Sequence, residues 1–217
     1  MNTLTTIDEL GFAPALQQDV LEDTTSDHAL LEATRSGDQD AFAELVSRYR
    51  NQITSYIYRM TNDYDGAVDL AQETFVRVYR AADRYQRSYA FSTYIYRIAT
   101  NLALNWLRDH RHEVCHQRLD NAPPQFRLRE PQARTPNMEE FLLRDVRLAE
   151  VRAAIQELPA NHRAAVLMHK YQELDYVEMA RVMNCSVPAI KSLLFRAYEN
   201  LPRRLAHLDP LAQRPAA

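Results

Sequence analysis

The segment FSTYIYRIATNLALNWL, residues 91–107, repeats apolar side chains at steps of three and four. This spacing is typical of an amphipathic helix that buries one face. We expect the helix to begin near Ser92, whose hydroxyl is suited to cap its first turn. The predicted inward-facing residues are Phe91, Ile95, Ile98, Leu102 and Trp106.

Two helices of the same periodicity precede this segment. The first is predicted over residues 40–60, with Asp38 and Asp40 as candidate caps, and the second over residues 65–85. Short polar turns separate the three helices, which therefore predict one compact bundle. Residues 1–27 lack sustained periodicity, and we expect them to form a mobile acidic leader.

The polar face of residues 91–108 combines aromatic, guanidinium and amide groups. Such groups stack on unpaired bases, bind phosphates and read base edges. A solvated helix face has a similar composition, so both interpretations stay open. The residues of this face are Tyr94, Arg97, Asn101, Asn105 and Arg108.

An acidic patch lies on the predicted helix before it. Asp69, Gln72 and Glu73 are neighbours at positions i, i+3 and i+4, and three arginines follow. The patch is suited to dock a basic partner helix. It is equally typical of a solvated face in which Glu73 pairs with Arg77.

Helical periodicity fails over residues 113–138, where four prolines lie among mixed charges. This composition is typical of a linker. Periodicity returns from Phe141 to Leu158, and a short helix is predicted around residues 163–171. The sequence therefore predicts an all-α fold of two small helical domains joined by a flexible, Pro-containing linker.

The last two predicted helices have the form of a helix-turn-helix. Asp175 and Glu178 have capping-box spacing, and residues 184–186 form a tight turn in which Ser186 caps the next helix. Pro188 is tolerated in a first helical turn. A helix-turn-helix binds the major groove through its second helix, but an ordinary helical hairpin gives the same pattern. The outer face of the second helix carries Pro188, Ala189, Lys191, Ser192, Phe195 and Arg196.

The net charge of −3 conceals a segregation of charge. Residues 1–34 carry seven acidic side chains and no Lys or Arg. By contrast, residues 35–112 carry eleven Arg against nine acids, and residues 161–207 carry seven basic residues against four acids. Two basic segments behind an acidic leader are compatible with a nucleic-acid partner.

Several classes of function have no residues to support them. The chain has only 3 Gly, so a Gly-rich phosphate loop is excluded, and no nucleophile–base arrangement indicates an enzyme. Two cysteines suit a reducing cytoplasm, and neither a signal peptide nor a membrane-spanning run is present. Potential metal ligands crowd into one segment without a clear second pair, so we expect no metal and no cofactor. These ligands are His110, His112, Cys115 and His116.

Two motif sets together resemble the extracytoplasmic-function (ECF) class of bacterial sigma factors. The stretch DLAQETFVRVYRA, residues 69–81, followed by residues 91–107, resembles sigma region 2. The stretches from Leu158 to Met183 and from Val187 to Ala197 resemble sigma region 4. The resemblance implies region 2 over residues 28–112, region 4 over residues 139–207, and a short tail over residues 208–217.

The resemblance also implies roles for individual residues. Contact with the β′ clamp helices of RNA polymerase core is implied for Leu45, Arg48, Tyr49, Asp69, Gln72 and Glu73. Capture of the opened minus-ten strand is implied for Arg80, Arg84, Tyr85, Ser88, Tyr89, Tyr94, Arg97, Asn101, Asn105 and Arg108. Reading of the minus-thirty-five element is implied for Tyr176, Val187, Pro188, Ala189, Lys191, Ser192, Phe195 and Arg196.

We therefore expect a cytoplasmic, non-enzymatic sigma factor for stress-responsive transcription. Its implied partners are RNA polymerase core (the β′ clamp helices and the β subunit), promoter DNA and an anti-sigma factor, which could hold it at the inner membrane without its own insertion. Two alternatives stay open: a stand-alone helix-turn-helix repressor or activator, and a helical scaffold that does not bind DNA. The acidic patch of Asp69, Gln72 and Glu73 distinguishes a sigma factor from a stand-alone regulator, because the patch has a purpose only if polymerase is the partner.

Overall fold

The computed structural model describes residues 26–85, 89–110, 148–172 and 174–205. Regular structure within these ranges is helical throughout, so the all-α prediction is confirmed. The predicted linker over residues 113–138 lies outside the described residues, as do residues 1–25.

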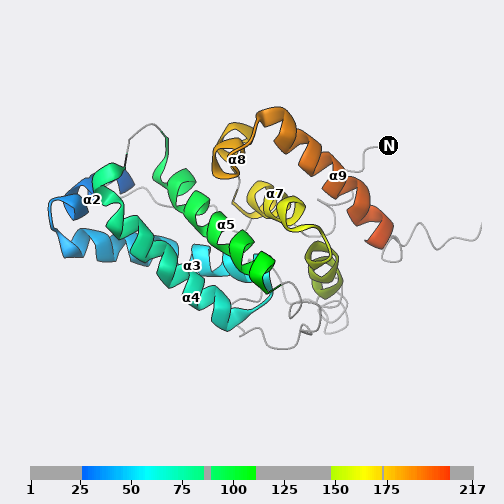
Figure 1. Cartoon of the computed structure of the whole chain (residues 1–217), viewed down its shortest axis with the longest axis horizontal. Helices are drawn as coiled ribbons and strands as arrows, with labels where there is room; N and C mark the ends of the chain where they lie inside the picture. Colours follow the sequence, from blue (N-terminus) through cyan, green and yellow to red (C-terminus); the bar gives the residue numbers. More distant parts are fainter. Residues whose placement is uncertain (1–25, 86–88, 111–147, 173, 206–217) are drawn as a thin grey trace, which may run out of the picture.

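The first half of the chain forms a bundle in which α3 packs on both α2 and α4, and α5 packs on α3 and α4 (Figure 1). It comprises α2 (Asp27–Arg35), α3 (Gln39–Thr61), α4 (Tyr64–Arg80), the short 3₁₀ helix η1 (Ala82–Arg84) and α5 (Phe91–Asp109).

The second half begins with a helical stretch at residues 148–156. It continues with α7 (Ala160–Tyr171), α8 (Tyr176–Val182) and α9 (Val187–Leu205). Helices α8 and α9 form a bent pair beside α7, as expected of a helix-turn-helix (Figure 1).

Local capping explains where most helices begin. Asp38 is the N-cap of α3, as predicted, and its carboxylate accepts hydrogen bonds from the backbone amides of Asp40 and Ala41 at 2.9 and 3.1 Å. The prediction for Ser92 is wrong. Helix α5 begins at Phe91 after Ala90, and no side chain caps it.

Three further predictions need correction. The helix predicted over residues 65–85 ends at Arg80, and a 3₁₀ turn replaces its last part. Asp27, assigned to the leader, is the first residue of α2, a helix too short for its periodicity to stand out. Trp106 is only half-buried, and its ring stacks on His110 with centroids 4.3 Å apart.

The two predicted domains lie in contact and share one hydrophobic core. Helix α8 packs against α5, and α7 packs against α3 and α5. Figure 1 shows this arrangement, with α8 beside the upper part of α5 and α7 close to its lower part. Helices α5 and α9, one from each half, therefore belong to one closed body.

A buried arginine joins the two halves. Arg163 of α7 is 6% exposed, and its guanidinium donates hydrogen bonds to the carbonyl oxygens of Met60, Gln156 and Leu158. Met60 lies in the last turn of α3, where carbonyl groups lack helical partners and attract positive charge. Burial lowers the pKa of Arg163 to about 10, so the side chain stays charged at neutral pH.

Weaker contacts extend this junction. The amide of Gln156 donates to the carbonyl oxygen of Arg59 at 2.7 Å. The Arg59 guanidinium lies 4.3 Å from the centre of the Tyr171 ring, a cation–π contact between α3 and α7. The Tyr96 hydroxyl donates to Gln172, so α5 also takes part.

We expect Arg163→Ala to lower the free energy of unfolding by about 2–4 kcal/mol, because it leaves a cavity and three buried carbonyl groups without their donor. Urea denaturation followed by circular dichroism measures this loss. Arg77→Ala is the matched control: Arg77 is half-exposed and, among the described residues, forms an ion pair with Glu73 alone, so its loss should cost less than about 0.5 kcal/mol. Equal stability of Arg163→Ala and Arg77→Ala would contradict a structural role for Arg163.

Candidate nucleic-acid and partner-binding surfaces

The polar face predicted on α5 lies at the surface. Arg97, Asn101, Asn105 and Arg108 are exposed, while Tyr94 is half-buried. Burial raises the pKa of Tyr94, so its phenol stays protonated and able to donate a hydrogen bond. The helix thus presents a continuous stripe of donors beside an aromatic ring, which is suited to an unpaired strand.

Aromatic rings continue this surface at the start of α5. The Tyr85 and Tyr94 rings meet edge to face with centroids 5.0 Å apart, and Phe91 lies 6.4 Å from each. Tyr89 is half-buried and Arg80 is exposed. Of the other residues predicted for this surface, Ser88 and the side chain of Arg84 lie outside what the structure describes.

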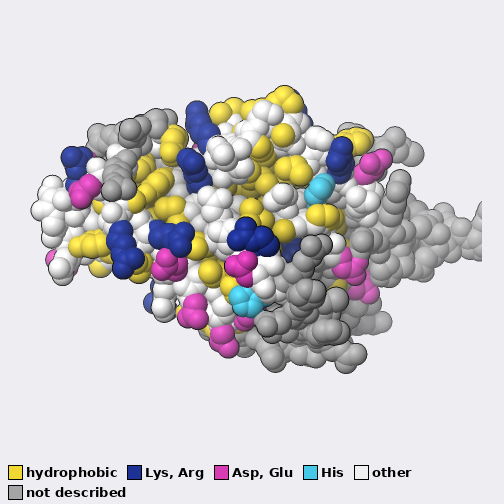
Figure 2. All heavy atoms as spheres, in the orientation of Figure 1, with side chains coloured by type: hydrophobic (Ala, Val, Ile, Leu, Met, Phe, Trp, Pro, Cys, Tyr) yellow, Lys and Arg dark blue, Asp and Glu magenta, His cyan; other side chains and the backbone are white. Residues whose placement is uncertain are grey.

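The acidic patch on α4 is accessible. Asp69 and Gln72 are exposed, and Glu73 accepts a hydrogen bond from Arg77 at 2.7 Å. In Figure 2, basic and acidic side chains lie close together over the face formed by α4 and α5. The negative part of this face is suited to a basic partner.

Apolar side chains extend the patch, which the sequence reasoning missed. Val76 and Tyr79 are 40% and 49% exposed, and the Tyr79 ring contacts Phe42 of α3 edge to face at 5.0 Å. The available signal was their spacing on one helix: Val76 lies four residues beyond Gln72 and three beyond Glu73, and Tyr79 follows three residues later. Exposed apolar groups beside a charged patch are typical of a protein-binding surface.

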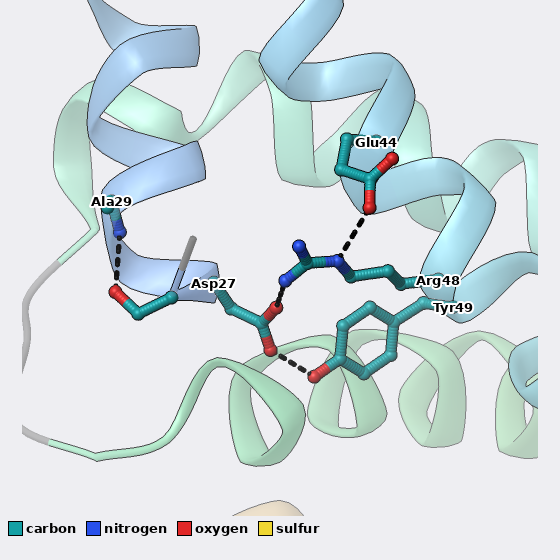
Figure 3. Close-up of polar contacts among 6 residues, drawn as sticks. Asp27, Ala29, Glu44, Arg48 and Tyr49 are labelled. Atoms are coloured by element: carbon teal, nitrogen blue, oxygen red, sulfur yellow. Dashed lines mark hydrogen bonds and ion pairs between the residues drawn. The ribbon is translucent and has the colours of Figure 1, made fainter. Parts of the chain in front are cut away.

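The α3 residues expected at the polymerase interface differ in exposure: Leu45 requires a correction, whereas Arg48 and Tyr49 are half-buried. Leu45 is fully buried, so it supports the core rather than contacting a partner. Arg48 and Tyr49 turn toward α2, where both bind the carboxylate of Asp27, at 2.9 and 2.5 Å (Figure 3). Arg48 also binds Glu44 at 2.9 Å. These polar side chains therefore hold α2 against α3 (Figure 3).

The helix-turn-helix is built as predicted. Asp175 accepts hydrogen bonds from the amides of Val177 and Glu178, both at 2.7 Å, and the Glu178 carboxylate in turn accepts one from the amide of Asp175 at 3.0 Å. This reciprocal pair is the capping box of α8. At the start of α9, the Ser186 hydroxyl accepts a bond from the Ala189 amide at 3.4 Å.

The N-terminal part of α9 presents a mixed polar and apolar face. Phe195 is 67% exposed and Tyr176, at the start of α8, is 39% exposed. Val187 and Ala189 are half-buried, so they offer less contact area than expected. The other predicted contact residues are exposed: Pro188, Lys191, Ser192 and Arg196.

Tyr176 has supporting residues that the sequence did not reveal. Its ring stacks on the ring of His169 of α7, with centroids 5.7 Å apart. The Lys191 ammonium group also contacts the Tyr176 ring, 5.7 Å from its centre. His169 in turn shares a 2.8 Å hydrogen bond with Tyr198. Because these residues come from three helices, only the folded chain brings them together.

Metal binding finds no support in the described part of the chain, where no group of three His, Cys, Asp or Glu side chains converges. His110 stacks on Trp106, whereas His112, Cys115 and His116 lie outside the described residues. Within the same part of the chain, none of the helices has the length and apolar character that crossing a bilayer requires.

Comparison with known proteins agrees with this geometry. A family model for Sigma-70 region 2 matches residues 45–113, and one for Sigma-70, region 4 matches residues 148–201. The RNA polymerase sigma-H factor of Pseudomonas aeruginosa is 34% identical over 187 residues, covering 84% of this chain and 95% of that protein. The ECF RNA polymerase sigma-E factor of Escherichia coli strain K12 is 32% identical over 199 residues, covering 89% of this chain and 100% of that protein.

A solved structure, CnrH in complex with the cytosolic domain of CnrY, shares the fold, with a TM-score of 0.61 and 20% identity over 85% of this chain and 99% of that chain. An all-helical chain with these two regions defines a transcription initiation factor of the sigma-70 type. More particularly, the chain belongs to the ECF class of sigma factors, which direct promoter-specific transcription.

We expect Asp175→Ala to lower the free energy of unfolding by about 1 kcal/mol, because the first amides of α8 lose their capping carboxylate. Urea denaturation measures the change. Asp175→Asn is the control, since asparagine caps helices about as well as aspartate. A loss of the same size in both variants would show that the carboxylate charge, rather than the cap geometry, stabilises α8.

Proposed function

We propose that the chain is a dissociable, non-enzymatic subunit that gives RNA polymerase core its promoter choice in the cytoplasm. The observation that carries this proposal is the presence of three separate exposed surfaces on one chain. They are the acidic and apolar face of α4, the amide and arginine stripe of α5, and the outer face of α9. The chemistry of transcription then belongs to the polymerase.

The α4 face is assigned to the β′ clamp helices. Asp69, Gln72 and Glu73 offer negative and polar groups, and Val76 and Tyr79 offer apolar area beside them. Charged groups steer a partner into register, whereas buried aromatic groups supply much of the binding energy. This combination supports docking better than an acidic patch alone.

The α5 stripe is assigned to the opened minus-ten strand. Asn101 and Asn105 can bond base edges, and Arg97 and Arg108 can bind phosphates. Tyr85, Tyr89 and Tyr94 stand at the start of the helix, where they can stack on unpaired bases, with Arg80 nearby on α4. An ordinary solvated face needs no such concentration of aromatic rings.

The α9 face is assigned to the minus-thirty-five duplex. Its N-terminal half is suited to the major groove, where Ser192 and Arg196 can reach base edges and Phe195 can contact thymine methyl groups. Lys191 and Tyr176 are placed to contact the DNA backbone. We accordingly assign residues 27–112 to region 2, residues 139–207 to region 4, and an anti-sigma factor as the regulatory partner.

Run-off transcription with purified core polymerase on a genomic promoter library tests the proposal. We expect the chain to redirect initiation to a distinct promoter set. The double variant Asp69→Ala with Glu73→Ala should lower core affinity at least about tenfold without changing the unfolding midpoint, because both side chains lie at the surface. Asp65→Ala, at an exposed acid on the same helix outside the patch, is the control. Failure of the wild-type chain to redirect initiation would refute the proposed function.

The closed arrangement is incompatible with binding both promoter elements at once. The elements are 25 base pairs apart by name, which corresponds to about 85 Å of duplex at 3.4 Å per base pair. Helix α8 touches α5, and α9, which follows α8 directly, has 19 residues and thus a length of about 28 Å. The reading faces therefore lie too close together, and we infer that polymerase separates the two halves.

We expect energy transfer between dyes at Asp65 of α4 and Glu199 of α9 to be high in the free chain and low in the promoter-bound holoenzyme. Both positions are exposed and lie outside the proposed contact residues. Steady-state fluorescence with the native cysteines replaced by serine measures the transfer. Unchanged transfer in a complex that initiates transcription would contradict the separation.

A further inference from the structure

The first turn of α2 touches two different parts of the molecule. Ser26 caps the helix by accepting a bond from the Ala29 amide, and Asp27 binds Arg48 and Tyr49 of α3 (Figure 3). The next residue, His28, turns instead toward the segment between α4 and α5. Its Nδ1 lies 3.0 Å from the Tyr85 hydroxyl.

The hydrogen bonds of Tyr85 define the role of His28. The Tyr85 hydroxyl donates to the carbonyl oxygen of Tyr89 at 3.1 Å. A tyrosine hydroxyl has a single proton, and a carbonyl only accepts. His28 must therefore donate from Nδ1, and the Tyr85 oxygen accepts. The His28 imidazole thus fixes the Tyr85 hydroxyl, and this hydroxyl fixes the backbone carbonyl of Tyr89.

The Tyr85 ring contacts aromatic side chains at the start of α5. It meets Tyr94 edge to face at 5.0 Å and lies 6.4 Å from Phe91, which packs against Tyr49 at 5.2 Å. Interlocked aromatic rings restrict one another, because each edge-to-face contact fixes the relative orientation of two planes. A shift of Tyr85 would therefore move Tyr94 and Tyr89 as well.

We propose that His28 is a positioning residue for the minus-ten surface, holding Tyr85, Tyr89 and Tyr94 ready to stack on unpaired bases. This inference rests on the proposed function of that surface. Residue 28 precedes the stretch matched by the region 2 family model, which begins at residue 45. The region 2 family model therefore does not include His28, and its role follows from the hydrogen bond and the 5.7 Å ring contact with Tyr85.

The role is separable from folding. Asp27 attaches α2 to α3 through two hydrogen bonds that do not involve the imidazole. Leu30 and Leu31, in the middle of the helix, are buried in the core at 8% and 2% exposure. Loss of the His28 side chain should therefore leave α2 in place while Tyr85 loses its donor.

The test compares two replacements of His28 in the reconstituted holoenzyme. Asparagine places its Nδ2 donor close to the position of the imidazole Nδ1, whereas leucine has similar bulk and no donor. The probe is a single-stranded oligonucleotide carrying the non-template strand of a promoter identified by run-off transcription. We expect His28→Leu to weaken binding about fivefold, the effect of one lost hydrogen bond, and His28→Asn to stay within about twofold of wild type.

Core polymerase affinity and the binding of minus-thirty-five duplex should be equal in all three proteins. Equal strand binding by wild type and His28→Leu would overturn the proposal, and so would a His28→Asn variant as weak as His28→Leu. A matching loss of core affinity in His28→Leu would also overturn it by indicating a structural role. If the wild-type holoenzyme itself does not retain the strand, the assignment of the minus-ten surface fails instead.

Discussion

The closed shape of this sigma factor depends on one buried cation. Within the described residues no carboxylate pairs with Arg163. Its two terminal NH groups donate to three carbonyl oxygens, one at the end of α3, one at the end of the stretch 148–156 and one in the turn before α7, while its Nε is buried without a partner. The end of a helix suits this task, because its last carbonyl groups are unpaired and carry partial negative charge. The bond to Met60 therefore joins the two halves of the chain without an ion pair.

This constraint decides what the rest of the surface can do. With α8 held against α5, the Thr93 hydroxyl binds Glu178 at 3.4 Å, and the Arg181 guanidinium lies 5.8 Å from the ring of Tyr89. Residues of the helix-turn-helix thus occupy the end of the surface assigned to the opened strand. The faces of α4 and α9 point away from this junction and stay accessible. A partner can therefore dock on the closed form before the two halves separate.

Sequence patterns predicted the elements that depend on neighbours along the chain. The capping carboxylate of Asp38 and the capping box of Asp175 and Glu178 are local, because donor and acceptor lie within one turn. The stripe of α5 also follows from spacing alone. The prediction for Ser92 failed because a hydroxyl near a helix start is only a candidate cap, and α5 begins two residues too early for Ser92 to be its N-cap. The short α2 gave too few periodic positions to be recognised.

Sequence by itself determined the helical class of this protein, the order of its two regions and the residues that share each helix face, because these properties follow from the period of the helix and from local hydrogen bonds. Only the tertiary structure decided which faces are free. Leu45 is buried in the core, and Arg48 and Tyr49 form hydrogen bonds with Asp27. His28 forms a hydrogen bond with Tyr85, 57 positions away in the sequence. Such contacts arise when helices distant in sequence pack together, and no periodicity within a single helix encodes its partner.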